Sequence, residues 1–597
     1  MKRYSLAILL IFILCGNSLA AITNVYGRNY QLLNGLWDVI VDQYDQGQRM
    51  KVYENKSPEG LTDFYEYSFN GGERLHVPGD WNSQSPELKR YEGTVWYGRP
   101  FNHVSKPGER KILYFNGVNY KSNVYLNGKK IKGHEGGFTP FDVDVTDYLK
   151  NGENFLVVEV NNTRTPKSIP AMAFDWWNYG GITRDVMMVT VPENYLEDYF
   201  IRLNPKTTDK IDIDLKMSQP KEGVEVKVTI PELNQAFRGT TDKDGKIKGE
   251  IKAKKLQRWS NENPKLYEVI VETPDERVVE EIGFRNIEVK GNQILVNGEP
   301  QFMRSVSFHE EIPQRLGRAF SQNDAVMLIN EAKDLGVNMV RLAHYPQNEY
   351  IVREAERNGI LLWEEIPVWQ GIEFTDSMTL NKAKVMLSEM INRDKNRCAI
   401  GFWSVANETK PSPERNAFLK ELLKTGKKID STRLYTAAFD LVEFDENKGV
   451  FTMEDDFTDN LDVVGVNKYL GWYHQWPLDP KNAVWDVVNT KPLIITEFGG
   501  EALYGQEGSR DVVSSWSEDY QARLYEDNLT MFENIPNLVG VSPWVLYDFR
   551  SPFRFHPVNQ EGWNRKGLVS DKGQRKKAWY LMRDYYEKKK NEYRVKK

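Results

Sequence analysis

Two short stretches, GFWSVANE at residues 401–408 and PLIITEFG at residues 492–499, share one pattern: an apolar run that ends abruptly in a carboxylate. Buried parallel strands have this composition, and an acid directly after such a strand lies at the rim of its sheet. If both strands belong to one barrel, Glu408 and Glu497 can face each other across a pocket. Two facing carboxyl groups are the minimum that cleavage of a glycosidic bond requires. For either acid alone, an unrelated surface position at a strand end explains the pattern as well.

Strand and helix patterns alternate from about residue 291 to the end of the chain. A run of apolar residues at helical spacing between residues 325 and 335 stops at Gly336, as amphipathic helices do. Alternation over this length predicts a (β/α)8 TIM barrel over residues 291–597, with an open doubly wound sheet as the structural alternative. The eight predicted strands occupy residues 302–307, 339–343, 360–363, 399–405, 434–438, 463–466, 493–496 and 538–544.

The part of the chain before the predicted barrel has the pattern of two β-sandwiches. Residues 21–195 contain short alternating strands separated by turn signals such as Asn127-Gly128, which predicts a jelly-roll β-sandwich. Residues 196–290 alternate more strictly, and their number suits one immunoglobulin-like β-sandwich. The predicted fold class is therefore multidomain: a jelly roll, an immunoglobulin-like sandwich and a TIM barrel.

The first twenty residues predict a signal peptide. Lys2 and Arg3 precede an apolar stretch that is too short to span a membrane, and Ser18-Leu19-Ala20 has the pattern of a cleavage site. We therefore expect an exported protein, periplasmic or extracellular. Cleavage would leave Cys398 as the one cysteine, so no internal disulfide is expected.

Composition narrows the classes of partner. The 597 residues carry a formal net charge of −6, which argues against nucleic-acid binding. No later segment is long and apolar enough to predict a membrane anchor. The chain is 12% aromatic, which is compatible with stacking against sugar rings. We expect a carbohydrate as the partner, and homo-oligomerisation stays open.

Other polar and aromatic residues follow the predicted barrel strands, where TIM-barrel enzymes place their active sites. Asn407 is suited to donating a hydrogen bond to a sugar hydroxyl, whereas a hydrogen-bonded structural role stays open for His309 and a core position for Trp544. A metal site is the alternative use of the histidines, but no HExxH or Cys/His spacing supports it, so we predict no metal and no cofactor. The residues predicted to bind the substrate are His309, His344, Asn407, Tyr469, Tyr473 and Trp544.

Cleavage with retention of configuration needs two carboxyl groups in different protonation states. One keeps its proton near neutral pH and gives it to the departing oxygen, while the other is ionised and attacks the anomeric carbon. We assign Glu408 as the acid/base and Glu497 as the nucleophile, which predicts a covalent glycosyl-enzyme intermediate. This assignment requires a carboxyl separation of roughly 5–5.5 Å, whereas an inverting enzyme needs about 6.5–9.5 Å.

Several motifs together resemble glycoside hydrolase family 2. They are VPGDWN at residues 77–82, YEGTVWY at 91–97 and GHEGGFTPF at 133–141, together with the barrel stretch 338–346 and the Asn407-Glu408 pair. The resemblance covers nearly the whole chain after the predicted signal peptide. It implies a three-domain β-glycosidase that retains configuration, with Glu408 and Glu497 in the roles assigned above.

The sugar is indicated by two further motifs. FDWWNYGGI at residues 174–182 resembles the β-glucuronidase branch of the family, which implies that Asp175 reaches the substrate from the jelly roll. Asn564 and Lys566 match the Asn-x-Lys element that binds the sugar carboxylate in that branch, and an ammonium beside an amide does favour a uronate. We therefore predict an exported β-glucuronidase that releases terminal β-linked glucuronic acid from oligosaccharides or glucuronides. A β-galactosidase of the same family and an inactive carbohydrate-binding protein are the alternatives.

Overall fold

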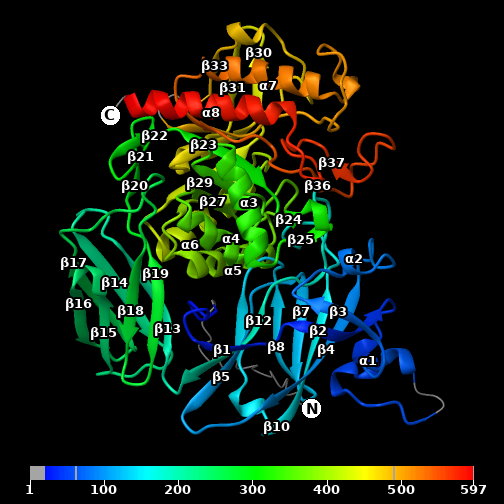
Figure 1. The fold of residues 1–597 in the computed structure, drawn as a ribbon, viewed down its shortest axis with the longest axis vertical. Coiled ribbons are helices and arrows are strands. Elements are labelled where there is room, and N and C mark those ends of the chain that lie inside the picture. Colours follow the sequence, from blue (N-terminus) through cyan, green and yellow to red (C-terminus); the bar gives the residue numbers. More distant parts are fainter. Residues whose placement is uncertain (1–20, 61–63, 488–490, 596–597) are drawn as a thin grey trace, which may run out of the picture.

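The computed structural model describes residues 21–60, 64–487 and 491–595, so the predicted signal peptide lies outside the described residues. Two β-sandwiches precede a closed barrel along the chain (Figure 1). The first sandwich, coloured blue to cyan, lies against one side of the barrel, and the second, in green, lies beside both. The predicted fold class is confirmed.

The first sandwich is built from two antiparallel sheets. The inner faces of the two sheets bury a core that includes Trp37, Val95, Leu113 and Phe115. Because each strand turns one face to this core and the other to solvent, apolar and polar residues alternate along it. One sheet contains, in spatial order, β3 (Glu73–Val77), β2 (Gly35–Asp42), β4 (Thr94–His103), β10 (Gly152–Asn161), β7 (Lys121–Leu126) and β8 (Lys129–Glu135). The other contains β1 (Asn29–Leu32), β12 (Val186–Pro192), β5 (Glu109–Phe115) and β9 (Phe141–Asp144).

The second sandwich is smaller and has its own core. Its strands alternate strictly between buried and exposed side chains, as β14 shows with buried Ile211, Ile213 and Leu215. Its first sheet contains β13 (Leu196–Leu203), β14 (Lys210–Met217) and β17 (Lys246–Lys252). Its second sheet contains β16 (Gln235–Thr240), β15 (Glu225–Ile230), β18 (Tyr267–Glu272) and β19 (Arg277–Ile282).

Eight parallel strands close the barrel in sequence order. Every residue of the strands that carry GFWSVAN and LIITE is buried, which explains their continuous apolar runs. Each of the eight predicted strands has a counterpart among them. The strands are β23 (Met303–Phe308), β26 (Met339–Leu342), β27 (Leu361–Glu365), β28 (Ile400–Asn407), β29 (Leu434–Phe439), β32 (Val463–Asn467), β34 (Leu493–Glu497) and β35 (Leu538–Val541).

Helices cover the outside of the barrel. Ser321 and Asp324 form a capping box at the start of the first, and Gly336, with a positive φ, follows its end, as the sequence pattern predicts. Between β29 and β34 the described residues contain 3₁₀ turns and a small sheet of β30 (Val442–Asp445), β31 (Val450–Met453) and β33 (Trp485–Asp486) in place of α-helices. The helices are α3 (Gln322–Asp334), α4 (Glu349–Arg357), α5 (Ser377–Asp394), α6 (Pro413–Ile429), α7 (Glu518–Phe532) and α8 (Lys577–Val595).

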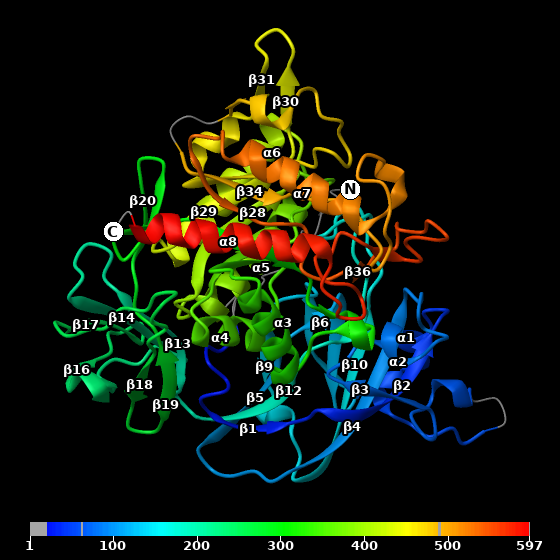
Figure 2. The ribbon, with the colours of Figure 1, turned by 45° about the horizontal axis from the view of Figure 1, so that its top comes forward.

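The jelly roll packs on the side of the barrel that carries α3, α4 and α5 (Figures 1 and 2). Phe138 of the jelly roll stacks on Tyr345 of the barrel with 4.1 Å between ring centroids. Beside this stack, buried Arg184 forms an ion pair with Glu310, the two nearest atoms being Nη2 and Oε2 at 2.6 Å. Arg184 also donates to the carbonyl of Pro346, at 2.7 Å. This contact fixes the jelly roll to the loops that follow the first two barrel strands.

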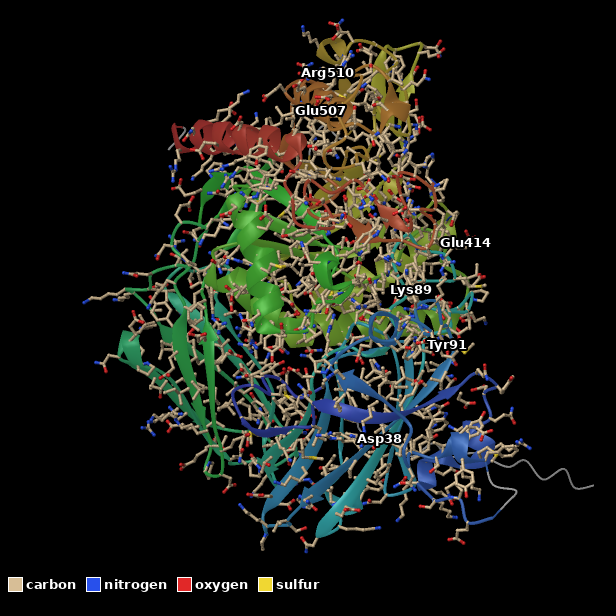
Figure 3. The ribbon with its side chains drawn as sticks, turned by 45° about the vertical axis from the view of Figure 1, so that its right-hand side comes forward. Asp38, Lys89, Tyr91, Glu414, Glu507 and Arg510 are labelled. Atoms are coloured by element: carbon tan, nitrogen blue, oxygen red, sulfur yellow. The ribbon has the colours of Figure 1, made fainter. Side chains whose placement is uncertain are left out.

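Charged side chains lie on the outer surface of the jelly roll and of the barrel domain (Figure 3). Among them are Asp38 on the jelly roll and Glu414, Glu507 and Arg510 on the barrel domain. Within the described residues, no helix combines the length and apolar composition that crossing a bilayer would need.

We expect Arg184→Met to lower the free energy of unfolding by about 3 kcal/mol, because it leaves a buried carboxylate without its main partner. Arg74→Met is the matched control: Arg74 is exposed, pairs with Asp38 on the jelly-roll surface, and should cost less than about 1 kcal/mol. Urea unfolding followed by tryptophan fluorescence measures both. Equal losses in the two variants would contradict the role given to the Arg184–Glu310 pair.

Candidate active site

A cavity of about 610 Å³ opens at the carboxyl ends of the barrel strands, where the jelly roll meets the barrel. Most of the residues singled out from the sequence line this one cavity, although they come from points far apart in the chain. They are Asp175, His344, Glu408, Tyr469, Tyr473, Glu497, Trp544, Asn564 and Lys566.

Glu497 is the last residue of β34 and its carboxylate is held by two donors. Arg341 Nη1 donates to Oε1 at 2.7 Å, and the Tyr469 hydroxyl donates to Oε2 at 2.6 Å. Burial raises the pKa of Glu497, whereas these two contacts act in the opposite direction. A guanidinium at this distance favours the ionised carboxylate, which is the form that a nucleophile requires.

Glu408 directly follows β28 and has different surroundings. Its backbone adopts a φ of 53°, in the left-handed region that non-glycine residues rarely occupy, and the chain leaves the strand direction here. Both of its carboxyl oxygens accept from neutral amides, Oε1 from Asn467 and Oε2 from Gln370, each at 2.9 Å. Burial, together with the charges of Glu497 and Asp440, raises the pKa of Glu408 to about 7. Glu408 can therefore hold a proton at neutral pH.

Asn407 precedes Glu408 and lies just beneath the cavity surface. Its Oδ1 accepts from Arg341 Nη2 at 2.8 Å and from Asn467 Nδ2 at 3.1 Å. Its buried Nδ2 has no hydrogen-bond partner within the described parts of the chain. Because an unpaired buried donor is costly, this amide is placed to donate to a ligand hydroxyl.

His309 is buried and is not among the residues that line the cavity, and its Nε2 has no hydrogen-bond partner among the described residues. Its Nδ1 lies 3.2 Å from the Tyr345 hydroxyl, and its ring packs against Phe549 and the edge of Trp544. Burial lowers the pKa of His309 well below its ordinary value, so the ring is neutral. Its position supports Trp544, whose own ring does line the cavity and stacks on His344 with 4.7 Å between centroids.

Arg341 and Glu365 complete the site, although the sequence pattern did not assign them functional roles. Arg341 is fully buried on β26, and its Nη2 lies 3.0 Å from Glu365 Oε1. Burial acts to raise the pKa of Glu365, but Arg341 and His344 outweigh it and lower the pKa to about 2. The sequence offered two signals for this network: a charged arginine inside an otherwise apolar strand, and an apolar run at residues 360–363 that ends in Glu364 and Glu365.

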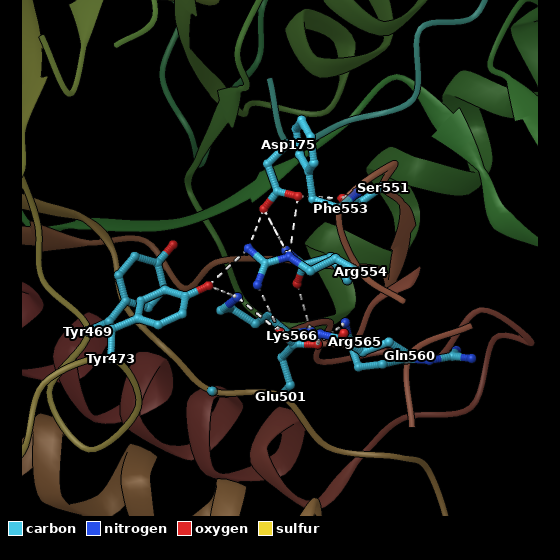
Figure 4. A network of polar contacts seen from close by, with 12 residues as sticks. Asp175, Tyr469, Tyr473, Glu501, Ser551, Phe553, Arg554, Gln560, Arg565 and Lys566 are labelled. Atoms are coloured by element: carbon cyan, nitrogen blue, oxygen red, sulfur yellow. Dashed lines mark hydrogen bonds and ion pairs between the residues drawn. The ribbon is translucent and has the colours of Figure 1, made fainter. Parts of the chain in front are cut away.

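The other end of the cavity is lined by cations and aromatic hydroxyls (Figure 4). Lys566 Nζ lies 2.7 Å from the Tyr473 hydroxyl and 3.4 Å from Glu501 Oε1. Asn564 is fully buried beside it and donates to Asp175 Oδ2 at 3.3 Å. The jelly-roll aspartate, the amide and the ammonium are thus brought together as the sequence motifs implied.

Arg554 was not predicted from the sequence. It lies on the loop between β36 (Phe549–Arg550) and β37 (Trp563–Asn564), pairs with Asp175, and donates to the Tyr473 hydroxyl at 3.0 Å (Figure 4). This loop has no periodic pattern that would place its side chains, so only the fold shows that a second cation reaches the cavity.

No cluster of three or more His, Cys, Asp or Glu side chains in the described ranges has an arrangement that could hold a metal ion. Besides Glu408 and Glu497, the cavity is lined by three cations among the described residues, Lys410, Arg554 and Lys566.

Three family models match consecutive parts of the chain. The model described as "Glycosyl hydrolases family 2, sugar binding domain" matches residues 30–192. "Glycosyl hydrolases family 2" matches residues 194–285, and "Glycosyl hydrolases family 2, TIM barrel domain" matches residues 287–591.

Individual proteins are similar over most of the chain. A beta-glucuronidase of Rattus norvegicus is 28% identical, over 94% of this chain and 91% of its own length. A beta-glucuronidase of Streptococcus agalactiae serotype V is 29% identical, over 87% of this chain and 94% of its own. Among solved structures, a beta-glucuronidase of an uncultured Clostridium sp. superposes with a TM-score of 0.79 and 26% identity, over 94% of this chain and 98% of that one.

The assigned protonation state of Glu408 can be measured directly. We expect its carboxyl to titrate near pH 7 and Asp440→Asn to lower that pKa, because the variant removes a negative charge that favours the protonated form. Glu443→Gln, on the same cavity wall, is the matched control and should leave the pKa of Glu408 unchanged. Carbon-13 NMR of labelled glutamate, assigned with Glu408→Gln, provides the measurement. A Glu408 pKa near 4 would refute the assignment.

Proposed function

The chain belongs to glycosyl hydrolase family 2 and is a glycoside hydrolase, and from this premise we propose that it is a retaining β-glucuronidase that releases terminal β-linked glucuronic acid. One observation carries the proposal: two carboxyl groups with opposite surroundings, Glu408 among amides and Glu497 on a guanidinium, line a single cavity.

The proposed reaction proceeds in two steps at the anomeric carbon. Glu408 donates its proton to the glycosidic oxygen as that bond breaks, and Glu497 bonds to the anomeric carbon to form a glycosyl ester. Glu408, now ionised, then takes a proton from water, whose oxygen attacks the same carbon and releases Glu497. Two inversions restore the original configuration, and the proton balance returns Glu408 to its starting state.

Asn407 and Tyr469 assist without exchanging covalent bonds. The free Nδ2 of Asn407 is positioned to donate to a ring hydroxyl of the bound sugar. Tyr469 orients the nucleophile through its 2.6 Å contact with Glu497. Holding the reacting carboxylate in a fixed position lowers the entropic part of the barrier.

Lys566, Asn564 and Arg554 support a uronate as the sugar. A carboxylate on the sugar ring would meet an ammonium and a guanidinium at the end of the cavity away from Glu408, and such charge-assisted hydrogen bonds are strong. Relatives named beta-glucuronidases point to the same substrate class. A β-galactosidase is the rival, and one observation favours it: Arg554 and Lys566 already contact Asp175 and Glu501, so a neutral sugar would leave no cation unpaired.

The wall beside Glu408 supports a hydroxyl-rich leaving group, such as the next sugar of an oligosaccharide. Lys410 pairs with Asp440 there, with 2.9 Å between Nζ and Oδ2, and Gln370, Glu443 and His474 complete this side. These groups offer donors and acceptors to hydroxyls, and Trp369, which also lines the cavity, offers a ring on which the apolar face of a sugar can stack.

We also propose that the protein acts outside the cytoplasm, on the basis of the signal-peptide pattern in residues 1–20. A mature amino terminus at Ala21 in the exported fraction of the producing cells would support this location, and full-length protein retained in the cytoplasm would refute it.

We expect Glu497→Gln to reduce turnover of nitrophenyl β-glucuronide by about 10⁴-fold or more, because the amide cannot form the glycosyl ester. Its circular dichroism and unfolding midpoint should stay close to those of the parent protein. Proton NMR of the first product of the parent enzyme should show the β-anomer. Full activity in the variant, or an α-anomer as first product, would end the assignment.

We expect Lys566→Ala and Arg554→Ala to raise KM for nitrophenyl β-glucuronide by about tenfold or more, which corresponds to the loss of about 1.4 kcal/mol of binding to the sugar carboxylate. Cleavage of the β-galactoside should change far less in both variants. Parallel kinetics on the two substrates measure the difference. Equal losses on both would refute the carboxylate role and favour the galactosidase alternative.

A further inference from the structure

A second cavity, of about 220 Å³, lies where the immunoglobulin-like sandwich meets the barrel. Its walls come from β13, from β20 (Ile287–Lys290) and from the loops that precede β28 and β29. It therefore opens at the amino ends of the barrel strands. The eight residues of β28, at about 3.3 Å each, separate it from the candidate active site by about 25 Å. We call it the arginine cavity, because Arg202, Arg285 and Arg433 line it.

Arg285 is the residue whose charge lacks compensation. Its Nε donates to the carbonyl of Cys398 at 2.9 Å, and its Nη2 donates to the carbonyl of Ile400. Across residues 21–60, 64–487 and 491–595, no carboxylate lies within ion-pair distance of its guanidinium, and its Nη1 forms no hydrogen bond. Burial and the neighbouring Arg433 lower the pKa of Arg285 to about 9, and the opposing effect of Asp430 and Glu356 does not offset them.

The other two arginines add positive charge to the same space. Arg433 Nε lies 3.4 Å from Asp430 Oδ2, and its Nη2 donates to the carbonyl of Arg397 at 3.1 Å. Arg202 lies at the rim and pairs with Asp214. Arg433 and Arg202 are therefore paired with carboxylates, and Glu288 also lines the cavity. Arg285 donates to backbone carbonyls, which satisfy its N–H groups but do not neutralise its charge.

We propose that the arginine cavity binds a small oxyanion, phosphate or sulfate, and that the bound anion joins the immunoglobulin-like sandwich to the barrel. Guanidinium groups match the geometry of such anions and bind them through paired hydrogen bonds. The cavity volume exceeds what one tetrahedral anion needs. The two main contacts lie on different units, Arg285 at the end of the sandwich and Arg433 before β29. An anion between them would neutralise the buried charge and strengthen the interface.

The test is the thermal unfolding midpoint of the full chain, measured with inorganic phosphate or with sulfate at constant ionic strength, chloride being the balancing ion. Binding to the folded state raises the midpoint with the logarithm of the anion concentration once that concentration exceeds the dissociation constant, whereas the general salting-out effect of these anions is small at millimolar concentration and grows in proportion to it. We expect a rise of a few degrees that begins at millimolar concentration and follows the logarithmic form. A logarithmic rise with phosphate alone would assign the site to phosphate, and such a rise with both anions would assign it to tetrahedral oxyanions in general.

Variants separate this cavity from other anion sites. Arg285→Gln and Arg433→Gln should each abolish the logarithmic rise, and Arg285→Lys should keep part of it. Arg277→Gln, an exposed arginine on β19 of the same sandwich, is the matched control and should retain all of it. Lys566→Gln should also retain it, which excludes anion binding in the candidate active site. Glycosidase activity of Arg285→Gln should equal that of the parent enzyme.

The proposal is overturned if the midpoint rises only in linear proportion to the anion concentration, if Arg285→Gln and Arg433→Gln both retain the logarithmic rise, or if Lys566→Gln alone loses it. Isothermal titration of folded protein with phosphate provides an independent readout, so that a variant with a low unfolding midpoint still yields a result.

Discussion

One buried guanidinium determines the arrangement of the candidate active site. Arg341 has no exposed surface and contacts Glu497, Glu365 and Asn407, so it joins the proposed nucleophile and the amide proposed to bind the sugar in one network of contacts. Burial alone would lower the pKa of Arg341, but Glu365 and Glu497 raise it, and the arginine remains charged. A buried cation between two buried carboxylates tolerates little displacement, because moving any member leaves an unpaired charge in the core.

The jelly roll completes the cavity as well as covering the barrel. Asp175 enters from a jelly-roll loop and contacts Arg554 and Asn564, which belong to the last part of the barrel domain. The position of Asp175 in the cavity depends on the ion pair of Arg184 with Glu310 and on the stack of Phe138 on Tyr345, because these contacts fix the jelly roll to the barrel. The end of the cavity proposed to bind the uronate therefore exists only in the assembled molecule, and its loops are held by rigid elements on both sides.

The sequence identified candidate site residues where a local pattern of residue types also marks a position in the fold. Glu408 and Glu497 could be found because an apolar strand that ends in an acid marks the rim of a barrel, and Gly336 marked the end of α3. The sheet of β30, β31 and β33, which replaces helices between β29 and β34, carried no signal that distinguishes it from an ordinary connection.

Residues whose roles depend on distant partners escaped the sequence analysis. Arg554 lies on an irregular loop, so its approach to Asp175, 379 positions away, follows only from the complete fold. His309 illustrates the opposite case. Its place after a barrel strand indicated a substrate contact, whereas its ring packs against Trp544 and is not part of the cavity lining. Strand ends show which residues can reach the rim, but the side chains packed above them decide which ones meet the ligand.

The environments of the two acids also account for the change of role that the proposed mechanism demands of Glu408. In the free enzyme the negative charge of Glu497 is one of the causes that raise the pKa of Glu408. Formation of the glycosyl ester removes that charge, while the amides of Asn467 and Gln370, which favour the ionised form, stay in contact. The pKa of Glu408 must then fall, and the group that has just donated a proton becomes a base at the step where water has to be deprotonated. In the proposed mechanism, the charge of Glu497 thus keeps Glu408 protonated before the first step, and the loss of that charge makes Glu408 a base for the second.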